Sequence, residues 1–172
     1  ARAVLRALDG VPAVVDAGAL AQLPKRVAAT VVLTPHAGEL AILLRSRGVE
    51  VDRAGIEAEP LRWAREAHRL TGATVLLKGA TTLVVGAGGE VFSQAEAPPW
   101  LATAGAGDVL AGMLGALLAG CSEAVVAEPS LAGRLAAAAA LVHGRSAHAA
   151  NPGGPVSASA LAAAAPGSSP GS

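Results

Sequence analysis

Three short aliphatic runs, separated by helical segments, constrain the fold of this chain most strongly. The runs cover residues 12–15, 30–33 and 74–77, and apolar residues recur at helical spacing in 38–46 and 60–71. Runs that are apolar throughout fit strands buried on both faces, and strands that alternate with helices favour a mainly parallel sheet. We therefore predict an α/β fold of three layers, with helices on both faces of the sheet.

The remaining segments predict a hairpin and several helices. Segments 83–85 and 91–93 flank a glycine-rich turn, which indicates a β-hairpin. Helical patterns continue to Gly120 after the next loop and then cover 131–149 and 156–164, with a further helical pattern at 1–8, whereas 48–59 and 123–128 are predicted to be irregular.

Length and composition bound the class of protein. The 172 residues fit one domain, predicted over 1–165, with a small, polar and disordered tail at 166–172. Lys+Arg and Asp+Glu are 13 each, so no basic field exists to hold nucleic acid or an anionic membrane. The single Cys121 cannot form an internal disulfide. We expect a cytoplasmic protein with neither nucleic acid nor membrane as a partner.

A loop with glycine at every second position leads directly into an apolar helix. It reads Gly105-Ala106-Gly107-Asp108. Glycines let backbone N–H groups converge, and a helix N-terminus adds partial positive charge, which together favour an anion such as phosphate. Asp108 is then either part of the chemistry or an ordinary first-turn acidic residue. The helix is apolar on all sides, which predicts burial, and Gly112 and Gly115 are interpreted as permitting close packing.

Lys78 follows the third predicted strand and precedes Gly79-Ala80-Thr81-Thr82. A strand end followed by small residues lets N–H and hydroxyl groups reach phosphate oxygens, with the lysine as a point charge. The alternative is a solvated lysine at the end of a strand.

Other polar residues lie where the predicted strands end. Asp16 follows the first strand, and His36 and Glu39 follow the second. Ligands of parallel sheets bind outside the carboxyl ends of the strands. His36 can hydrogen-bond a ligand, whereas Glu39 either positions a metal or phosphate or caps the next helix. His143 and His148 are five residues apart, which is wrong for one helix face, so no metal pair is predicted.

Taken together, these motifs resemble those of the ribokinase-like superfamily, and within it the ADP- or ATP-dependent NAD(P)H-hydrate dehydratases. The matching segments are 14–17 with 19–20, 33–39, 76–82, 102–112, 140–144 and 154–158. The glycine–aspartate loop is shared by many kinases of the superfamily. The Thr-Pro-His-x-Gly-Glu pattern, together with Lys-Gly-Ala-x-Thr, points more narrowly to the hydrate dehydratases.

The resemblance implies an enzyme that repairs hydrated NADH and NADPH with ADP or ATP and Mg²⁺. It implies that Asp108 accepts the proton of a hydroxyl during phosphorylation, and that His36 and Asp108 bind the substrate. The residues implied to bind the nucleotide are Lys78, Gly79, Ala80, Thr81, Thr82 and Gly107, and those implied to form the anion hole are Gly105, Ala106 and Gly107.

The chain also departs from the family pattern. Gly18 and Ala21 stand where the family usually has Asp and Asn, which puts contacts at the end of the first strand in doubt. The family's domain begins earlier, so we expect an N-terminally incomplete sheet with an unpaired edge, little activity from this chain alone, and association as a homo-oligomer. An epimerase, fused or separate, is an expected partner. Two alternatives remain: a vitamin-precursor or sugar kinase of the same fold, and an inactive fragment.

Overall fold

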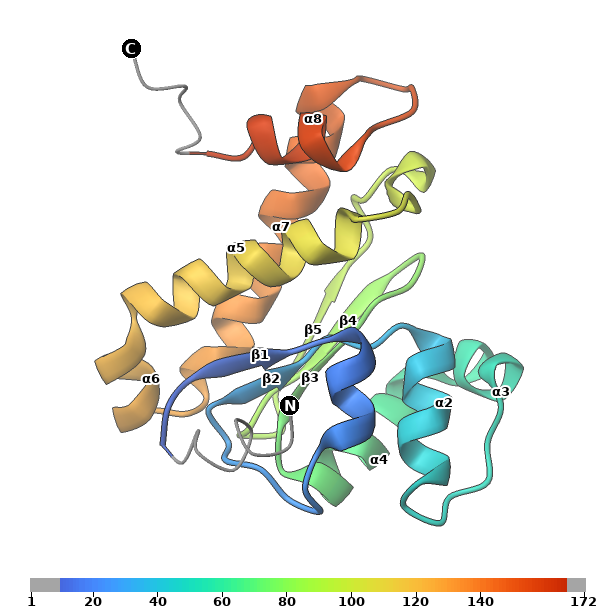
Figure 1. The fold of residues 1–172 in the computed structure, drawn as a ribbon, viewed down its shortest axis with the longest axis vertical. Helices are drawn as coiled ribbons and strands as arrows, with labels where there is room; N and C mark the ends of the chain where they lie inside the picture. Colours follow the sequence, from blue (N-terminus) through green and yellow to red (C-terminus); the bar gives the residue numbers. More distant parts are fainter. Residues whose placement is uncertain (1–9, 167–172) are drawn as a thin grey trace.

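The structure is a computed structural model, and it describes residues 10–166. Its centre is a sheet of five strands in the order β1-β2-β3-β4-β5 (Figure 1). The strands are β1 (Ala13–Val15), β2 (Val31–Leu33), β3 (Thr74–Leu77), β4 (Thr82–Val85) and β5 (Val91–Gln94). The first three run parallel, and the β3–β4 and β4–β5 pairs are antiparallel. The sheet is therefore mixed, because the predicted hairpin supplies both antiparallel pairs.

Helices cover both faces of this sheet, as predicted (Figure 1). One face packs against the 3₁₀-helix η1 (Ala17–Gln22) and the helices α2 (Ala37–Arg45), α3 (Arg53–Ala58) and α4 (Pro60–Thr71). The other packs against α5 (Ala106–Gly120), α6 (Ser122–Ala127) and α7 (Leu131–Ala150). The short helix α8 (Ala158–Ala163) packs on α5 and α7, and the 3₁₀-helix η2 (Pro99–Leu101) precedes α5.

The alternation of side chains along each strand divides the core into two layers. Val31 and Leu33 join the cluster under α2 and α4, whereas Val32 between them joins the cluster under α5 and α7. Leu76 and Val84 face α7 in the same way. Strands buried on both faces are apolar at most positions, which is why the sequence shows nearly continuous aliphatic runs; Thr74, fully buried in β3, is a polar exception.

Two segments predicted to be irregular form short helices instead. The side chain of Asp52 accepts a hydrogen bond from Gly55 N–H (2.8 Å) and caps α3, whose Ile56 is fully buried. Similarly, α6 follows α5 almost directly and buries Val125. Each helix has a single buried side chain, which is too little for a periodic pattern to reveal.

Helix α5 is not buried on all sides. It buries Ala106, Leu110, Leu114 and Leu118, whereas Leu117 is 37% exposed. Within the described chain, a Cβ at Gly112 or at Gly115 would meet no atom within 4 Å, so the interpretation of these glycines as close-packing residues is wrong.

Parts of the predicted organisation fall outside residues 10–166. The helical pattern at 1–8 and nearly all of the predicted tail lie there, and the single domain over 1–165 stays a prediction. Of the helices that are described, none is long and apolar enough to cross a membrane.

Candidate active site

Three polar residues meet where the parallel strands end. Asp16 follows β1, His36 comes three residues after β2, and Lys78 follows β3 directly. His36 and Lys78 form an isolated parallel bridge, in which Lys78 N–H donates to the carbonyl of Pro35 (2.8 Å). The short extension of β2 and β3 brings the predicted residues to one edge of the sheet.

The ammonium of Lys78 lies between two carboxylates. Its Nζ is 2.9 Å from Asp16 Oδ1 and 3.9 Å from Glu39 Oε2. The three side chains are 22%, 15% and 21% exposed, so water screens the pairs only partly. The ammonium of Lys78 is therefore ion-paired and only partly exposed, which differs from the solvated lysine of the alternative, while its role in binding phosphate stays a prediction.

His36 and Glu39 together cap helix α2. His36 Nδ1 accepts hydrogen bonds from the N–H groups of Gly38 (3.0 Å) and Glu39 (3.3 Å), and Glu39 Oε2 accepts from His36 N–H (2.9 Å). Since Nδ1 is an acceptor here, the proton of the neutral imidazole is on Nε2. The His36 side chain is 58% exposed, and its Nε2, which lies 3.6 Å from Glu39 Oε2, is the ring nitrogen left for a ligand. Capping by Glu39, which the sequence left open, is thus observed, although Glu39 also lies near Lys78.

The glycine loop brings the first turn of α5 to the same edge. Gly105 precedes the helix with φ +82°, and a Cβ there would lie 3.0 Å from the Cβ of Ala158, so only glycine fits without strain. A Cβ at Gly107 would lie 3.3 Å from Lys78 Nζ and 3.9 Å from Asp16 Oδ2. The ion pair and the helix N-terminus are therefore in contact.

The backbone donors of this turn differ from those predicted. Ala106 N–H donates to the carbonyl of Thr103 (3.2 Å), which removes it from the predicted anion hole. In residues 10–166 no acceptor bonds to the N–H groups of Gly105, Gly107 or Asp108. The donors of a helix N-terminus that lack partners bind anions. Asp108 is exposed in this turn, where a carboxylate also complements the helix dipole.

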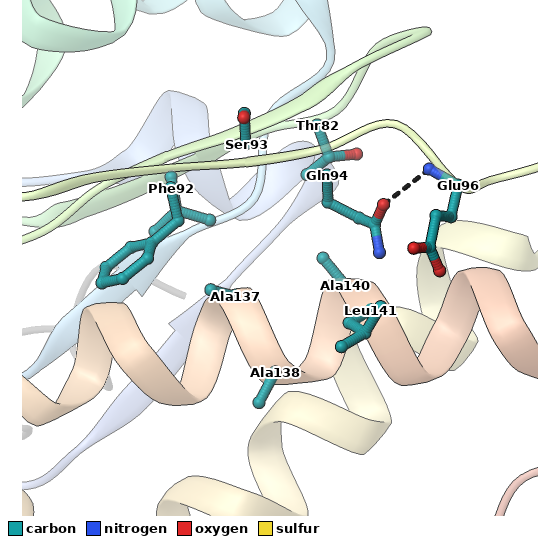
Figure 2. Close-up of a pocket in the computed structure, with 10 residues that line it drawn as sticks. Thr82, Phe92, Ser93, Gln94, Glu96, Ala137, Ala138, Ala140 and Leu141 are labelled. Carbon is teal, nitrogen blue, oxygen red and sulfur yellow. Dashed lines mark hydrogen bonds between the residues drawn. The ribbon is translucent and has the colours of Figure 1, made fainter.

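The loop after Lys78 is open to solvent and ends beside a groove. Gly79, Ala80 and Thr81 are exposed, and Thr82 begins β4. Thr82 lines a groove of about 320 Å³ between the β4–β5 hairpin and α7. Figure 2 shows Thr82 and Gln94 on the sheet side of this groove and Ala140 on α7. Small side chains on α7 leave this space open.

One residue of the site region was missed by sequence reasoning. His143 is buried, and its Nε2 lies 2.8 Å from the carbonyl oxygen of Ala106. The signal was its spacing: His143 falls in register with Ala136, Ala139 and Ala147, which form the buried face of α7. Burial lowers the pKa of His143, partly offset by the hydrogen bond to Ala106.

The fold places this chain in a known structural class. A ribokinase-like superfamily protein from Enterococcus faecalis superposes on 88% of this chain and 49% of its own with a TM-score of 0.66, at 24% sequence identity. This likeness confirms the ribokinase-like α/β fold. The family then follows from the sequence match: the NAD(P)H-hydrate dehydratase family model covers residues 2–164, and the chain belongs to that family.

Relatives within the family are similar over part of their length. The bifunctional NAD(P)H-hydrate repair enzyme Nnr of Mycobacterium tuberculosis is 45% identical over 126 residues, 69% of this chain and 25% of the relative. The ADP-dependent (S)-NAD(P)H-hydrate dehydratase of Xanthomonas campestris is 36% identical over 66% of this chain and 38% of its own length.

A solved dehydratase has the same fold. The ADP/ATP-dependent NAD(P)H-hydrate dehydratase of Bacillus subtilis, co-crystallised with ATP/Mg²⁺ and soaked with CoA, gives a TM-score of 0.71 at 28% identity. The superposition covers 89% of this chain and 53% of the Bacillus chain. The chain thus spans about half of this dehydratase and a quarter of the bifunctional relative.

Proposed function

We propose that this chain acts in the nucleotide-dependent dehydration of hydrated NADH and NADPH. The observation that carries the proposal is the meeting of Lys78, His36 and the first turn of α5 at one sheet edge, in a chain of the hydrate dehydratase family. ADP or ATP is the phosphoryl donor, in line with the ADP-dependent and ADP/ATP-dependent dehydratases of Xanthomonas and Bacillus that the chain resembles.

The chemistry requires a phosphoryl transfer before water can be lost. Hydroxide is a poor leaving group, so the ring hydroxyl first attacks the terminal phosphoryl group and loses its proton to a base. The lone pair of the ring nitrogen then expels phosphate as the C–O bond breaks. Loss of a ring proton restores the dihydronicotinamide.

Each predicted residue has a role that its position supports. Asp108 accepts the hydroxyl proton, since its carboxylate is exposed beside the free helix donors. The N–H groups of Gly105, Gly107 and Asp108 stabilise the phosphoryl group in transfer. His36 offers Nε2–H to the substrate. The nucleotide phosphates lie along Lys78, Gly79, Ala80, Thr81 and Thr82.

The residues present fit a magnesium ion that arrives with the nucleotide. No group of three His, Cys, Asp or Glu side chains within residues 10–166 could hold a metal ion alone. Mg²⁺ typically takes one or two carboxylates together with substrate phosphates, and Asp16 and Glu39 supply carboxylates at this edge. The ion would neutralise charge on the phosphates.

The test incubates the protein with hydrated NADPH and either ADP or ATP. Recovery of dihydronicotinamide absorbance with release of phosphate is the expected result. A stable phosphorylated product would replace the proposal with a small-molecule kinase, and the absence of both products would favour a chain without activity.

The matched variant is Asp108→Asn, which removes the base but keeps the shape of the side chain. Turnover should fall by about 10²–10⁴-fold while nucleotide binding persists. Near-normal turnover would remove Asp108 from the mechanism.

The wider setting is also a proposal. We place the enzyme in the cytoplasm, as a homo-oligomer, with an epimerase supplied by a fused or separate domain. The bifunctional relatives support the fused arrangement. Sedimentation velocity of the protein tests the oligomer, and a sedimentation coefficient of a monomer at all concentrations would contradict it.

A further inference from the structure

We propose that His143 and His148 are positioning residues that hold the two ends of segment 96–106 on helix α7 and thereby aim the free N–H group of Gly107. The assignment of that N–H group to phosphate rests on the proposed function, whereas the positioning itself does not.

The carbonyl that His143 holds belongs to the same peptide unit as the Gly107 N–H. Because the peptide is planar and trans, its C=O and N–H point in opposite directions. Fixing the carbonyl of Ala106 through His143 Nε2 (2.8 Å) therefore fixes the direction of the N–H. A hydrogen bond to the carbonyl also polarises the unit, which strengthens the N–H as a donor.

The geometry determines the protonation of the ring. A carbonyl oxygen can only accept, so Nε2 of His143 carries a proton, and burial of the side chain to 6% exposure disfavours a second proton on Nδ1. The carbonyl keeps a second lone pair for the helical ladder of α5. His143 is thus a neutral donor built into the packing of α5 on α7.

The other end of the segment rests on α7 through several contacts. His148 Nε2 lies 2.7 Å from the carbonyl of Glu96, and Arg145 Nε lies 3.4 Å from Glu96 Oε2. A Cβ at Gly144 would lie 3.4 Å from Ala97 Cα, so the backbone passes directly against the helix there. His143 and His148 are five residues apart on α7, so they do not share a metal ion. The same spacing lets each histidine hold a different end of segment 96–106.

The chain offers matched controls. His68 on α4 makes an equivalent imidazole–carbonyl hydrogen bond, from Nδ1 to Ala73 (2.7 Å), on the opposite face of the sheet. Of the two tryptophans, Trp100 lies inside the held segment and Trp63 lies on α4. Loss of a generic hydrogen bond can therefore be separated from loss of positioning.

The experiment compares wild type with His143→Leu, His143→Gln and His68→Leu by ¹⁵N NMR without ligand and by titration with ADP. In wild type, we expect His143 to be the Nε2–H tautomer. In His143→Leu, we expect the chemical shift of the Gly107 amide to change. ADP affinity should fall about 3- to 10-fold there, as for the loss of one hydrogen bond. His143→Gln, which keeps an N–H donor, should restore both readouts, and His68→Leu should change neither.

His148→Leu tests the other attachment. The indole resonance of Trp100 should move while that of Trp63 stays; an unmoved Trp100 resonance would overturn the role of His148. An Nδ1–H tautomer at His143, or an unmoved Gly107 resonance in His143→Leu, would overturn the role of His143. If wild type binds no ADP, the proposed function fails, and the ligand-free resonances still decide the positioning.

Discussion

At the scale of single residues, the site is organised around one shared cation. Lys78 pairs closely with Asp16 and more distantly with Glu39, and the same ammonium lies against Gly107 in the first turn of α5. A phosphate group that approaches this turn must compete with two carboxylates for Lys78. The ion pair therefore holds the Lys78 side chain in place without a ligand. A phosphate that binds Lys78 must gain more free energy than the loss of this ion pair costs.

Replacement of Lys78 by Met should destabilise the protein as well as weaken nucleotide binding. The change leaves Asp16 and Glu39 close together without their cation, which we expect to cost about 1.5–3 kcal/mol of unfolding free energy. Urea denaturation measures this loss. Lys25→Met is the control, because Lys25 is exposed and should change stability by less than about 0.5 kcal/mol. Equal effects of the two variants would contradict a structural role of the ion pair.

Acid should destabilise the protein through His143. Burial lowers the pKa of this imidazole below its usual 6.5, so the native state binds fewer protons than the unfolded state as pH falls below 6.5. The contribution of neutral His143 to the free energy of unfolding is fully present above pH 6.5, and it is lost as the pH falls through the pKa of the native state.

Thermal unfolding of wild type and His143→Gln between about pH 7 and pH 5 measures this contribution by difference; the pKa values of Glu66 and Glu128 are lowered from 4.5, which keeps these two carboxylates charged in this range. His143→Gln should flatten the dependence. The same slope in the variant would assign the acid sensitivity to other groups.

The positions of the polar residues at strand and helix ends could be predicted from the sequence, but the contacts between them could not. Lys78, His36 and Asp108 stand at strand and helix ends, which local sequence signals mark. The ion pair between Lys78 and Asp16 joins residues 62 positions apart, and the bond from His143 to Ala106 spans 37. Such contacts depend on how helices pack on the sheet, which no local pattern records.

At the scale of elements, the strands and most helices were predictable, the six-residue α8 included, whereas α3 and α6 were not. Helix α4 begins with Pro60 and ends at Gly72, whose φ is +78°, and both signals are local. Helices α3 and α6 have six residues each, so their existence depends on caps and tertiary contacts. Helix α5 shows the opposite error, since an apolar sequence predicted more burial than packing provides.

The two kinds of glycine in and before α5 should respond to alanine in opposite ways. Gly112→Ala should raise stability by about 0.5–1 kcal/mol, because the site is open and the backbone is helical. Gly105→Ala should lower it by about 1 kcal/mol or more, since φ is +82° and Ala158 is close. Urea titrations of both variants measure the difference. Destabilisation by Gly112→Ala would indicate a partner on that face of α5.

At the scale of the whole molecule, the two helical layers, one from the first half of the chain and one from the second, meet at the edge of the sheet that holds the candidate site. Helix α2 contributes His36 at its cap and Glu39, α5 contributes the free donors, and the sheet between them contributes Asp16 and Lys78. A ligand bound there contacts both layers. Binding should therefore stabilise the entire fold and not only a loop.

Thermal unfolding with ADP and Mg²⁺ tests this coupling. At a nucleotide concentration of about 100 times Kd, binding to the native state alone adds about 2.7 kcal/mol, which for a domain of this size raises Tm by about 5–10 °C. Asp108→Asn should keep the shift, because it removes a proton acceptor and leaves the phosphate donors in place. Lys78→Met should reduce it, since the cation that faces the phosphates is lost. An undiminished shift in Lys78→Met would mean that the nucleotide binds elsewhere on the molecule, away from the edge where Lys78 meets the first turn of α5.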